Sequence, residues 1–146
     1  MFKGTVPVEI RAMLFEASSS WKADALAVAC SGNFTIERVF AGRMPLMGCD
    51  VTIYSCALGA WFARKPFSAT LRPEYSEAFG WIGEGMADQA GTTATIMLLT
   101  GITDALDKNL AVKQNAYYTR LVDGYRRKWP EMLAKTRARL ESSPLQ

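Results

Sequence analysis

The chain has 146 residues, a formal net charge of +3 and no histidine. A chain of this length can form a globular core of ordinary size. The lack of histidine excludes Ser-His-Asp and Cys-His nucleophile systems, and three cysteines alone match no structural zinc spacing. We therefore predict neither a disulfide scaffold nor a metal site, and we expect Cys30 and Cys56 to be small buried thiols.

Membrane and secretory segments are not predicted. No apolar run is long enough to cross a bilayer, and residues 1–4 lack the apolar region of a signal peptide. We therefore expect a cytoplasmic protein with no membrane partner.

The positive charge is concentrated in the last quarter of the chain. Residues 108–146 hold nine Lys and Arg against three Asp and Glu, a balance of +6. Such a basic end predicts contact with nucleic acid or an acidic partner, and a solvated helix face remains the alternative. The candidate contacts are Arg120, Arg126, Arg127 and Lys128.

The first predicted element is a helix over residues 6–17, because Pro7 suits a first helical turn. An apolar stripe recurs along it at helical spacing: Ile10, Met13, Leu14 and Ala17. The three serines that follow, residues 18–20, end this helix.

A strand over residues 25–29, a tight turn over 30–33 and a helix then follow. In the turn, Gly32 is able to take a positive φ, and Asn33 is a good N-cap. Open α/β sheets bind nucleotide-like ligands at the edge where the strands end and the chain turns into the following helices. On the pattern alone, the turn is either an ordinary strand-to-helix connection or a ligand loop.

We interpret residues 44–49 as a connector and residues 50–54, which are β-branched and aromatic, as a second strand. Residues 55–63 then enter a short helix. This order predicts a parallel sheet with right-handed crossovers. In dinucleotide-binding folds, an acidic residue at the end of the second strand binds a ribose hydroxyl. Asp50 lies at the beginning of the predicted second strand, which is the opposite end. Residues 67–71 are a candidate third strand.

From Pro73 onward the chain is predicted to be helical. The expected helices are one opened by Pro73 that runs to Ile82, a buried one over residues 92–106, and one over 115–129 that continues over 131–141 beyond a kink or restart at Pro130. Trp61, Trp81 and Trp129 are expected to be core or interface anchors rather than base-stacking platforms.

Three strings carry a resemblance to a known family: residues 2–7 (FKGTVP), 30–38 (CSGNFTIER) and 54–59 (YSCALG). Together they resemble the N-terminal half of phage antirestriction DNA adenine methyltransferases, distant relatives of the Dam-like enzymes. The resemblance covers nearly the whole chain. It implies an α/β fold, with a small parallel sheet of Rossmann-like methyltransferase type over residues 1–72 and a helical subdomain over 73–146.

The resemblance also implies binding of S-adenosylmethionine. The loop that cradles the methionine part in Dam-like enzymes corresponds here to Cys30, Ser31, Gly32, Asn33 and Phe34. The loop that reaches the ribose and adenine corresponds to Tyr54, Ser55 and Cys56. Tyr54 is either a ring stacked on adenine or an ordinary core aromatic. Residues 2–4 resemble a further segment that touches the cofactor.

The sequence departs from the family pattern in its loops and its catalytic motif. The glycine loop has one glycine, and the predicted second strand lacks an acid at its end. Adenine-N6 methylation needs an Asp/Asn-Pro-Pro-aromatic motif to hold the flipped base. No Pro-Pro dipeptide occurs here, so we assign no catalytic residue.

The sequence therefore predicts a phage antirestriction or anti-defence protein that carries the S-adenosylmethionine-binding half of such an enzyme. The alternative is a non-enzymatic inhibitor of a host immune complex, acting through protein contact in the host cytoplasm. The expected partners are DNA or a host defence protein. Because so small a sheet leaves its edges open, we also expect a second copy or a complementary second half.

Overall fold

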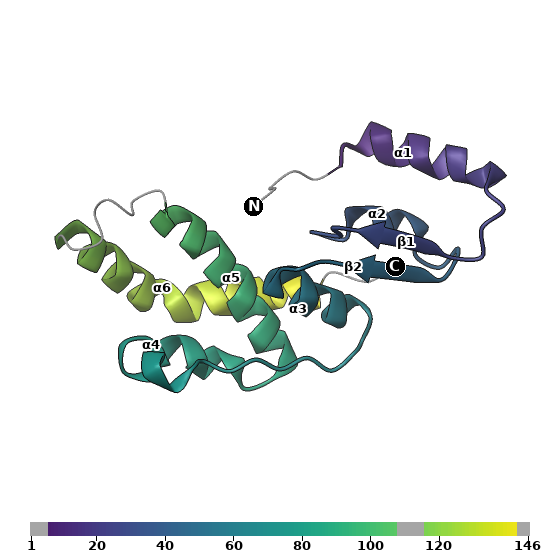
Figure 1. Cartoon of the computed structure of the whole chain (residues 1–146). Helices are drawn as coiled ribbons and strands as arrows, with labels where there is room; N and C mark the ends of the chain where they lie inside the picture. Colours follow the sequence, from purple (N-terminus) through teal and green to yellow (C-terminus); the bar gives the residue numbers. More distant parts are fainter. Residues whose placement is uncertain (1–5, 108–115, 143–146) are drawn as a thin grey trace. The chain divides into compact units, whose positions relative to one another are not determined.

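The computed structural model describes residues 6–107 and 116–142 (Figure 1). The chain divides into two compact units, and the boundary lies between Ala63 and Arg64. The sequence places the boundary between residues 72 and 73.

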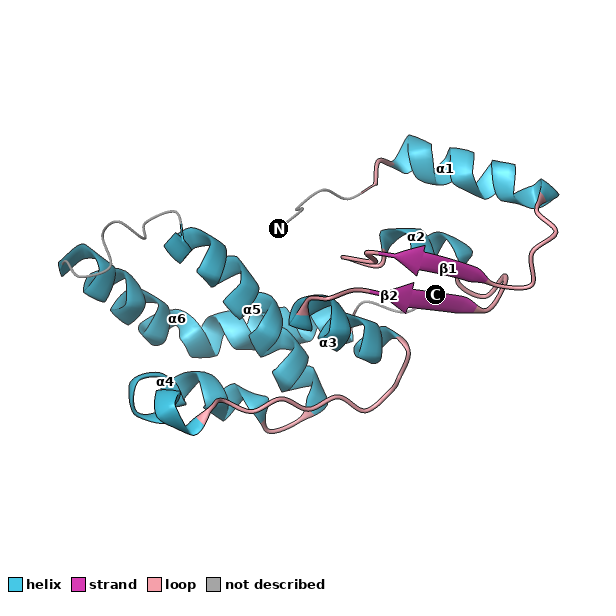
Figure 2. Ribbon diagram, in the orientation of Figure 1, coloured by secondary structure: helices cyan, strands magenta, loops and turns pink. Residues whose placement is uncertain are grey.

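The first unit combines helices with a two-stranded parallel sheet (Figure 2). Its elements are α1 (Val8–Ala17), β1 (Leu26–Ala29), α2 (Thr35–Phe40), β2 (Leu46–Cys49) and α3 (Ile53–Phe62). The register pairs Leu26 with Leu46 and Ala29 with Cys49, so both strands end at the same edge. A small parallel sheet among helices is therefore confirmed, and so are the predicted first helix and first strand.

The predicted second strand over residues 50–54 is wrong. The strand is β2, four residues earlier, in the segment expected to be a connector, and residues 53–62 form α3. The β-branched run favours a strand locally, but the Thr52 side chain accepts a hydrogen bond from the Ser55 N–H (3.2 Å) and caps α3. Asp50 consequently lies at the carboxyl end of β2.

The candidate third strand over residues 67–71 is also wrong. Residues 65–72 have no regular secondary structure, so the sheet has two strands within the described residues. Pro66 and Pro73 flank this segment, and a proline cannot donate a hydrogen bond to a neighbouring strand.

Helix α1 leaves its apolar stripe largely uncovered within the described part of the chain. Met13 is 57% exposed, Ile10 is also exposed, and α1 has no buried residue. Trp21, which follows this helix, stacks on Phe40 with ring centroids 5.7 Å apart. Phe40 is the largest fully buried side chain of this unit.

The second unit is helical. It contains α4 (Ser76–Gly83), which continues a 3-10 turn (Pro73–Tyr75), then a 3-10 turn (Glu84–Met86), α5 (Gln89–Asp107) and α6 (Ala116–Glu141). The helices predicted in this region are confirmed. Helix α6 runs through Pro130 as one helix, and the predicted start at Asn115 lies outside the described residues.

Helices α5 and α6 pack against each other around a core of Ile82, Ile102 and Trp129. The Trp129 ring is buried and meets the Trp81 ring edge-on, with centroids 5.2 Å apart. Trp129 is thus a core anchor, as predicted. None of the helices within the described residues is long and apolar enough to cross a membrane.

Asp88, the residue before α5, joins the two long helices. It accepts a hydrogen bond from the Gly91 N–H (2.8 Å) and pairs with the Arg137 guanidinium of α6 (2.8 Å). The Gly91 N–H and then Arg137 hold the pKa of Asp88 below its usual range.

Candidate ligand-binding site

The Asp50 carboxylate connects the two segments that follow the strands. One oxygen accepts a hydrogen bond from the Gly32 N–H in the loop after β1 (2.9 Å). The other accepts from the Thr52 N–H (2.9 Å) and the Thr52 hydroxyl (3.0 Å). The backbone N–H groups of Thr52 and Gly32 lower the pKa of Asp50 to about 2, because both favour the charged form.

The first turn of α3 makes two further hydrogen bonds to the same loop. The Ser55 hydroxyl donates to the Gly32 carbonyl (3.0 Å), and the Tyr54 hydroxyl donates to Oδ1 of Asn33 (2.7 Å). Tyr54 is half-buried, and this burial raises its pKa. The loop and the start of α3 therefore form one hydrogen-bonded junction at the carboxyl edge of the sheet.

The loop itself has an unusual backbone. Cys30, Gly32 and Phe34 all have positive φ, at 57°, 53° and 56°. Gly32 adopts the positive φ that glycine allows, whereas this conformation is strained for Cys30 and Phe34. The Ser31 N–H donates to the Cys49 carbonyl (3.0 Å), which ties the loop to the end of β2.

The expectation that Asn33 caps α2 is wrong. Phe34 is the N-cap residue, and α2 has no side-chain cap. The Asn33 side-chain oxygen instead accepts the hydrogen bond from Tyr54 of α3. A contact distant in sequence has thus replaced the local one.

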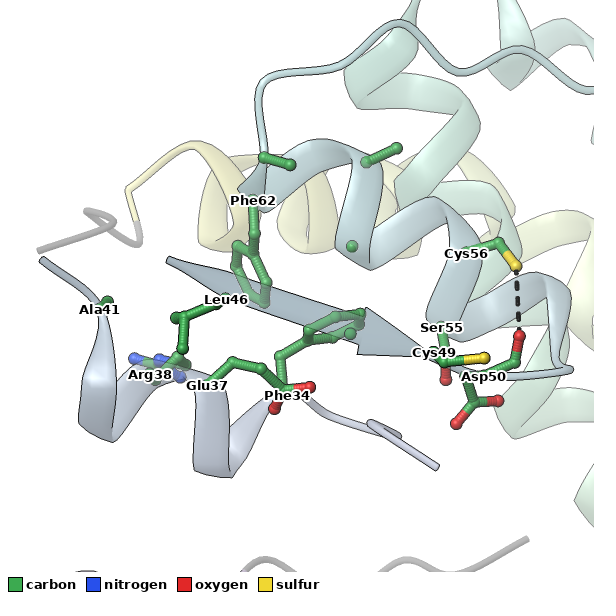
Figure 3. A pocket seen from close by; sticks show the side chains of 14 residues that line it. Phe34, Glu37, Arg38, Ala41, Leu46, Cys49, Asp50, Ser55, Cys56 and Phe62 are labelled. Carbon is green, nitrogen blue, oxygen red and sulfur yellow. Dashed lines mark hydrogen bonds between the residues drawn. The ribbon is translucent and has the colours of Figure 1, made fainter. Parts of the chain in front are cut away.

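A cavity of about 600 Å³ lies between α2, β2 and α3 (Figure 3). The side chains of Phe34, Leu46 and Phe62 turn toward one another on its apolar wall, and Asp50 and Cys56 lie toward its other end. The Phe34 and Phe62 rings meet edge-on, with centroids 5.9 Å apart.

Two glycines make room for the Phe34 ring beside this cavity. A Cβ atom at Gly59 would lie 2.5 Å from Cζ of Phe34, and one at Gly48 would lie 2.9 Å from its Cε1. Real Cβ atoms do not approach other atoms this closely. Gly48 of β2 and Gly59 of α3 therefore set the position of Phe34.

The cavity lining also includes the carboxylic acid Glu37 of α2. Its side chain is only 7% exposed, and neither carboxylate oxygen has a hydrogen-bond partner within the described part of the chain. A Cβ atom at Gly48 would lie 3.2 Å from Oε1 of Glu37, so the carboxylate lies against β2.

The expectation of buried thiols is wrong. Cys30, Cys49 and Cys56 are all free and exposed: Cys30 follows β1, Cys49 ends β2 and Cys56 lies in the first turns of α3. No group of metal-binding side chains gathers anywhere in residues 6–107 or 116–142.

The structure brings together all seven residues predicted to bind a cofactor: Cys30, Ser31, Gly32, Asn33, Phe34, Tyr54 and Ser55. Residues 2–4 lie outside the described residues. The four basic candidates belong to the second unit, where Arg120, Arg126, Arg127 and Lys128 are exposed on α6. Their predicted contact with nucleic acid or a partner stays a prediction.

Sequence reasoning missed Asp50, Thr52 and Glu37. A signal for the first two was present, since Asp and Thr side chains favour hydrogen bonds to nearby backbone groups in turns and at helix N-caps. No comparable signal marks Glu37, because burial of one acidic residue on a short helix depends on the packing of β2.

The sequence of the chain matches a known protein family. Residues 2–146 match the family described as Phage DNA Adenine Methylase-like domain 1. The chain belongs to this family. The resemblance predicted from the sequence is thus confirmed, as is a relationship to methyltransferases. No curated protein and no solved structure matches the chain.

In this phage methylase-like domain, the charge of Asp50 is expected to stabilise the first unit in a pH-dependent way. Its pKa is lower in the folded chain than the ordinary 3.8, so the stabilisation is present above about pH 4 and is lost as the pH falls toward 2. Thermal unfolding of Asp50→Asn should show a lower midpoint than wild type at neutral pH.

The difference in unfolding midpoint between Asp50→Asn and wild type should shrink as the pH is lowered from about 4 toward 2. Asp24→Asn, at an exposed carboxyl group before β1, is the matched control. A midpoint difference for Asp50→Asn that stays constant down to pH 2 would contradict the assigned hydrogen bonds.

Gly59→Ala should destabilise the domain by about 1–3 kcal/mol, because the added methyl group displaces the packed Phe34 ring. At Gly101 of α5 an added Cβ meets no atom within 4 Å, so Gly101→Ala should stabilise by about 0.5–1 kcal/mol. Urea denaturation gives both free energies of unfolding.

The double variant Gly59→Ala/Phe34→Leu tests the cause of this destabilisation. A smaller side chain at position 34 relieves the clash, so the two substitutions should be less destabilising together than their sum. Simple additivity would mean that the Gly59 effect does not act through Phe34.

Proposed function

We propose that this chain binds S-adenosylmethionine through its first unit and serves a phage antirestriction role in the host cytoplasm. Membership of the phage DNA adenine methylase-like family supports a methyl-donor cofactor. The observation that carries the proposal is the junction in which Asp50 and Ser55 hold the Gly32 loop beside the cavity.

The residues at this junction fit such a cofactor by size and chemistry. A cavity of about 600 Å³ falls within the usual range for small-molecule sites, about 300–1,000 Å³. One end of the cavity, at Asp50 and Ser55, reaches the carboxyl edge of the parallel strand pair, where α/β sheets of Rossmann-like type bind nucleotides. Its wall offers aromatic rings, and Asp50, Ser55 and Glu37 offer polar acceptors.

In this proposal the loop over residues 30–34 holds the methionine part, while Tyr54, Ser55 and Asp50 lie toward the ribose and adenine. The bound cofactor supplies an activated methyl group. The chain contains no Pro-Pro dipeptide, so we assign none of its residues to base recognition or methyl transfer.

Calorimetric titration with S-adenosylmethionine and S-adenosylhomocysteine tests the proposal. The folded chain should bind both ligands with dissociation constants of about micromolar order, which corresponds to a binding free energy of about −8 kcal/mol. Cys56→Trp should weaken binding at least about tenfold, because Cys56 is exposed and lines the cavity that the indole would fill.

Ala12→Trp is the matched control, because it adds the same indole at an exposed position on α1, outside the cavity. It should bind as wild type does. A folded wild-type chain that binds neither ligand at millimolar concentration would contradict the proposed function.

A second candidate function is inhibition of a host immune complex by protein contact. The observation that supports this function is the exposure of apolar side chains in the first unit. Val51 is 98% exposed, and Val8, Met13 and Ile53 are more than half exposed. Such side chains also suit a second copy or a complementary half of the protein. This function requires no cofactor, so a failed titration would favour it.

The basic face of α6 is proposed to contact DNA phosphates. Arg126, Arg127 and Lys128 are adjacent and exposed, so their removal should weaken binding to duplex DNA. In a triple alanine variant, the slope of log K against log salt should fall by about one for each phosphate that the protein no longer neutralises.

The exposed Lys22, before β1 in the first unit, provides the control for this measurement. Lys22→Ala should leave the slope unchanged. An affinity for DNA that does not depend on salt, or an unchanged slope in the triple variant, would exclude this contact.

A further inference from the structure

Glu37 is a buried carboxylic acid whose two oxygens lack hydrogen-bond partners within the described part of the chain. It belongs to α2 and to the lining of the cavity, with Phe34 one helical turn before it. Buried carboxylates in folded proteins are almost always paired, since burial of a charge without a partner is strongly unfavourable. Glu37 therefore calls for a hydrogen-bond donor.

Within the described residues, no cation on a neighbouring segment supplies this donor; the buried Nε of Arg11 on α1 has no hydrogen-bond partner either. Arg38 is exposed, and no ion pair joins it to Glu37 within the described residues. Arg43 lies over the Phe15 ring, 3.4 Å from its centroid, and also donates to the Ser18 hydroxyl (3.3 Å). The Glu37 carboxylate therefore has no cation bonded to it within the described residues, and a ligand group is able to supply the missing donor.

The surroundings define the chemistry of that partner. The walls beside Glu37 are apolar and aromatic, with Phe34, Leu46 and Phe62 turned toward one another (Figure 3). A group that matches one negative charge and two acceptor oxygens carries a positive charge and several N–H donors. A primary ammonium has three such donors and is small enough to enter beside aromatic rings.

We propose that Glu37 binds the ammonium group of the amino-acid part of S-adenosylmethionine. This inference rests on the proposed function and assigns Glu37 as the residue that recognises the charged end of the ligand. Glu37 follows the loop already expected to hold the methionine part by one helical turn. The pocket thus selects ligands that keep the amino group.

The test compares S-adenosylhomocysteine with its deaminated analogue, which lacks only the ammonium group. The wild-type chain should bind the deaminated analogue about 10- to 100-fold more weakly, as expected for loss of a charge-assisted hydrogen bond. Glu37→Gln should weaken binding of S-adenosylhomocysteine by a similar factor and should distinguish the two ligands much less.

Glu16→Gln, an exposed acid on α1, is the matched control and should bind both ligands as wild type does. Thermal unfolding without ligand checks the fold of each variant. Because Glu37→Gln removes an unpaired buried charge, its midpoint should equal or exceed that of wild type. The comparison of the two ligands on the wild-type chain remains valid even if the variant does not fold.

The outcomes separate this inference from the proposed function. If wild type binds both ligands equally, or if Glu37→Gln discriminates between them as wild type does, the ammonium assignment is overturned and cofactor binding stands. If Glu37→Gln loses affinity for S-adenosylmethionine alone, the carboxylate faces the sulfonium and the assignment is likewise overturned. If wild type binds none of the ligands, cofactor binding fails as well.

Discussion

The first unit depends on the hydrogen bonds that the Asp50 carboxylate accepts from the Gly32 and Thr52 N–H groups. These bonds join the loop after β1 to the turn after β2, and Ser55 adds a further bond to the same loop. Together with the bonds from Tyr54 to Asn33 and from the Ser31 N–H to Cys49, they hold a loop in which Cys30 and Phe34 adopt strained backbone conformations. A carboxylate at this edge therefore organises the loop itself.

The cavity is a consequence of the same arrangement. Once the loop is fixed, Phe34 projects between β2 and α3, where Gly48 and Gly59 leave space for its ring. Its ring and Phe62 form an apolar wall, and the lining also includes the buried Glu37, whose carboxylate has no hydrogen-bond partner among the described residues. Apolar walls with a few polar groups are typical of small-molecule sites.

The sequence predicted the elements whose signals are local. The β1 strand and the long helices follow from apolar periodicity and from the positions of glycine and proline. The predictions were wrong where contacts between residues distant in sequence determine the structure. The β-branched run after Asp50 suggested a strand, but pairing with β1 placed the strand at Leu46–Cys49, and Asn33 bonded to Tyr54 instead of capping α2. The seven residues predicted to bind a cofactor were assigned from the family resemblance, whereas no feature of the sequence indicated that Glu37 would be buried.

The most direct test of a cofactor site at the Asp50 junction is a titration of the ¹⁵N-labelled chain with S-adenosylhomocysteine, followed by amide NMR. The largest shifts should fall on residues 30–37 and 50–56, around the junction and the cavity. Shifts confined to α6, or none at saturating ligand with the fold intact, would contradict a site at this junction.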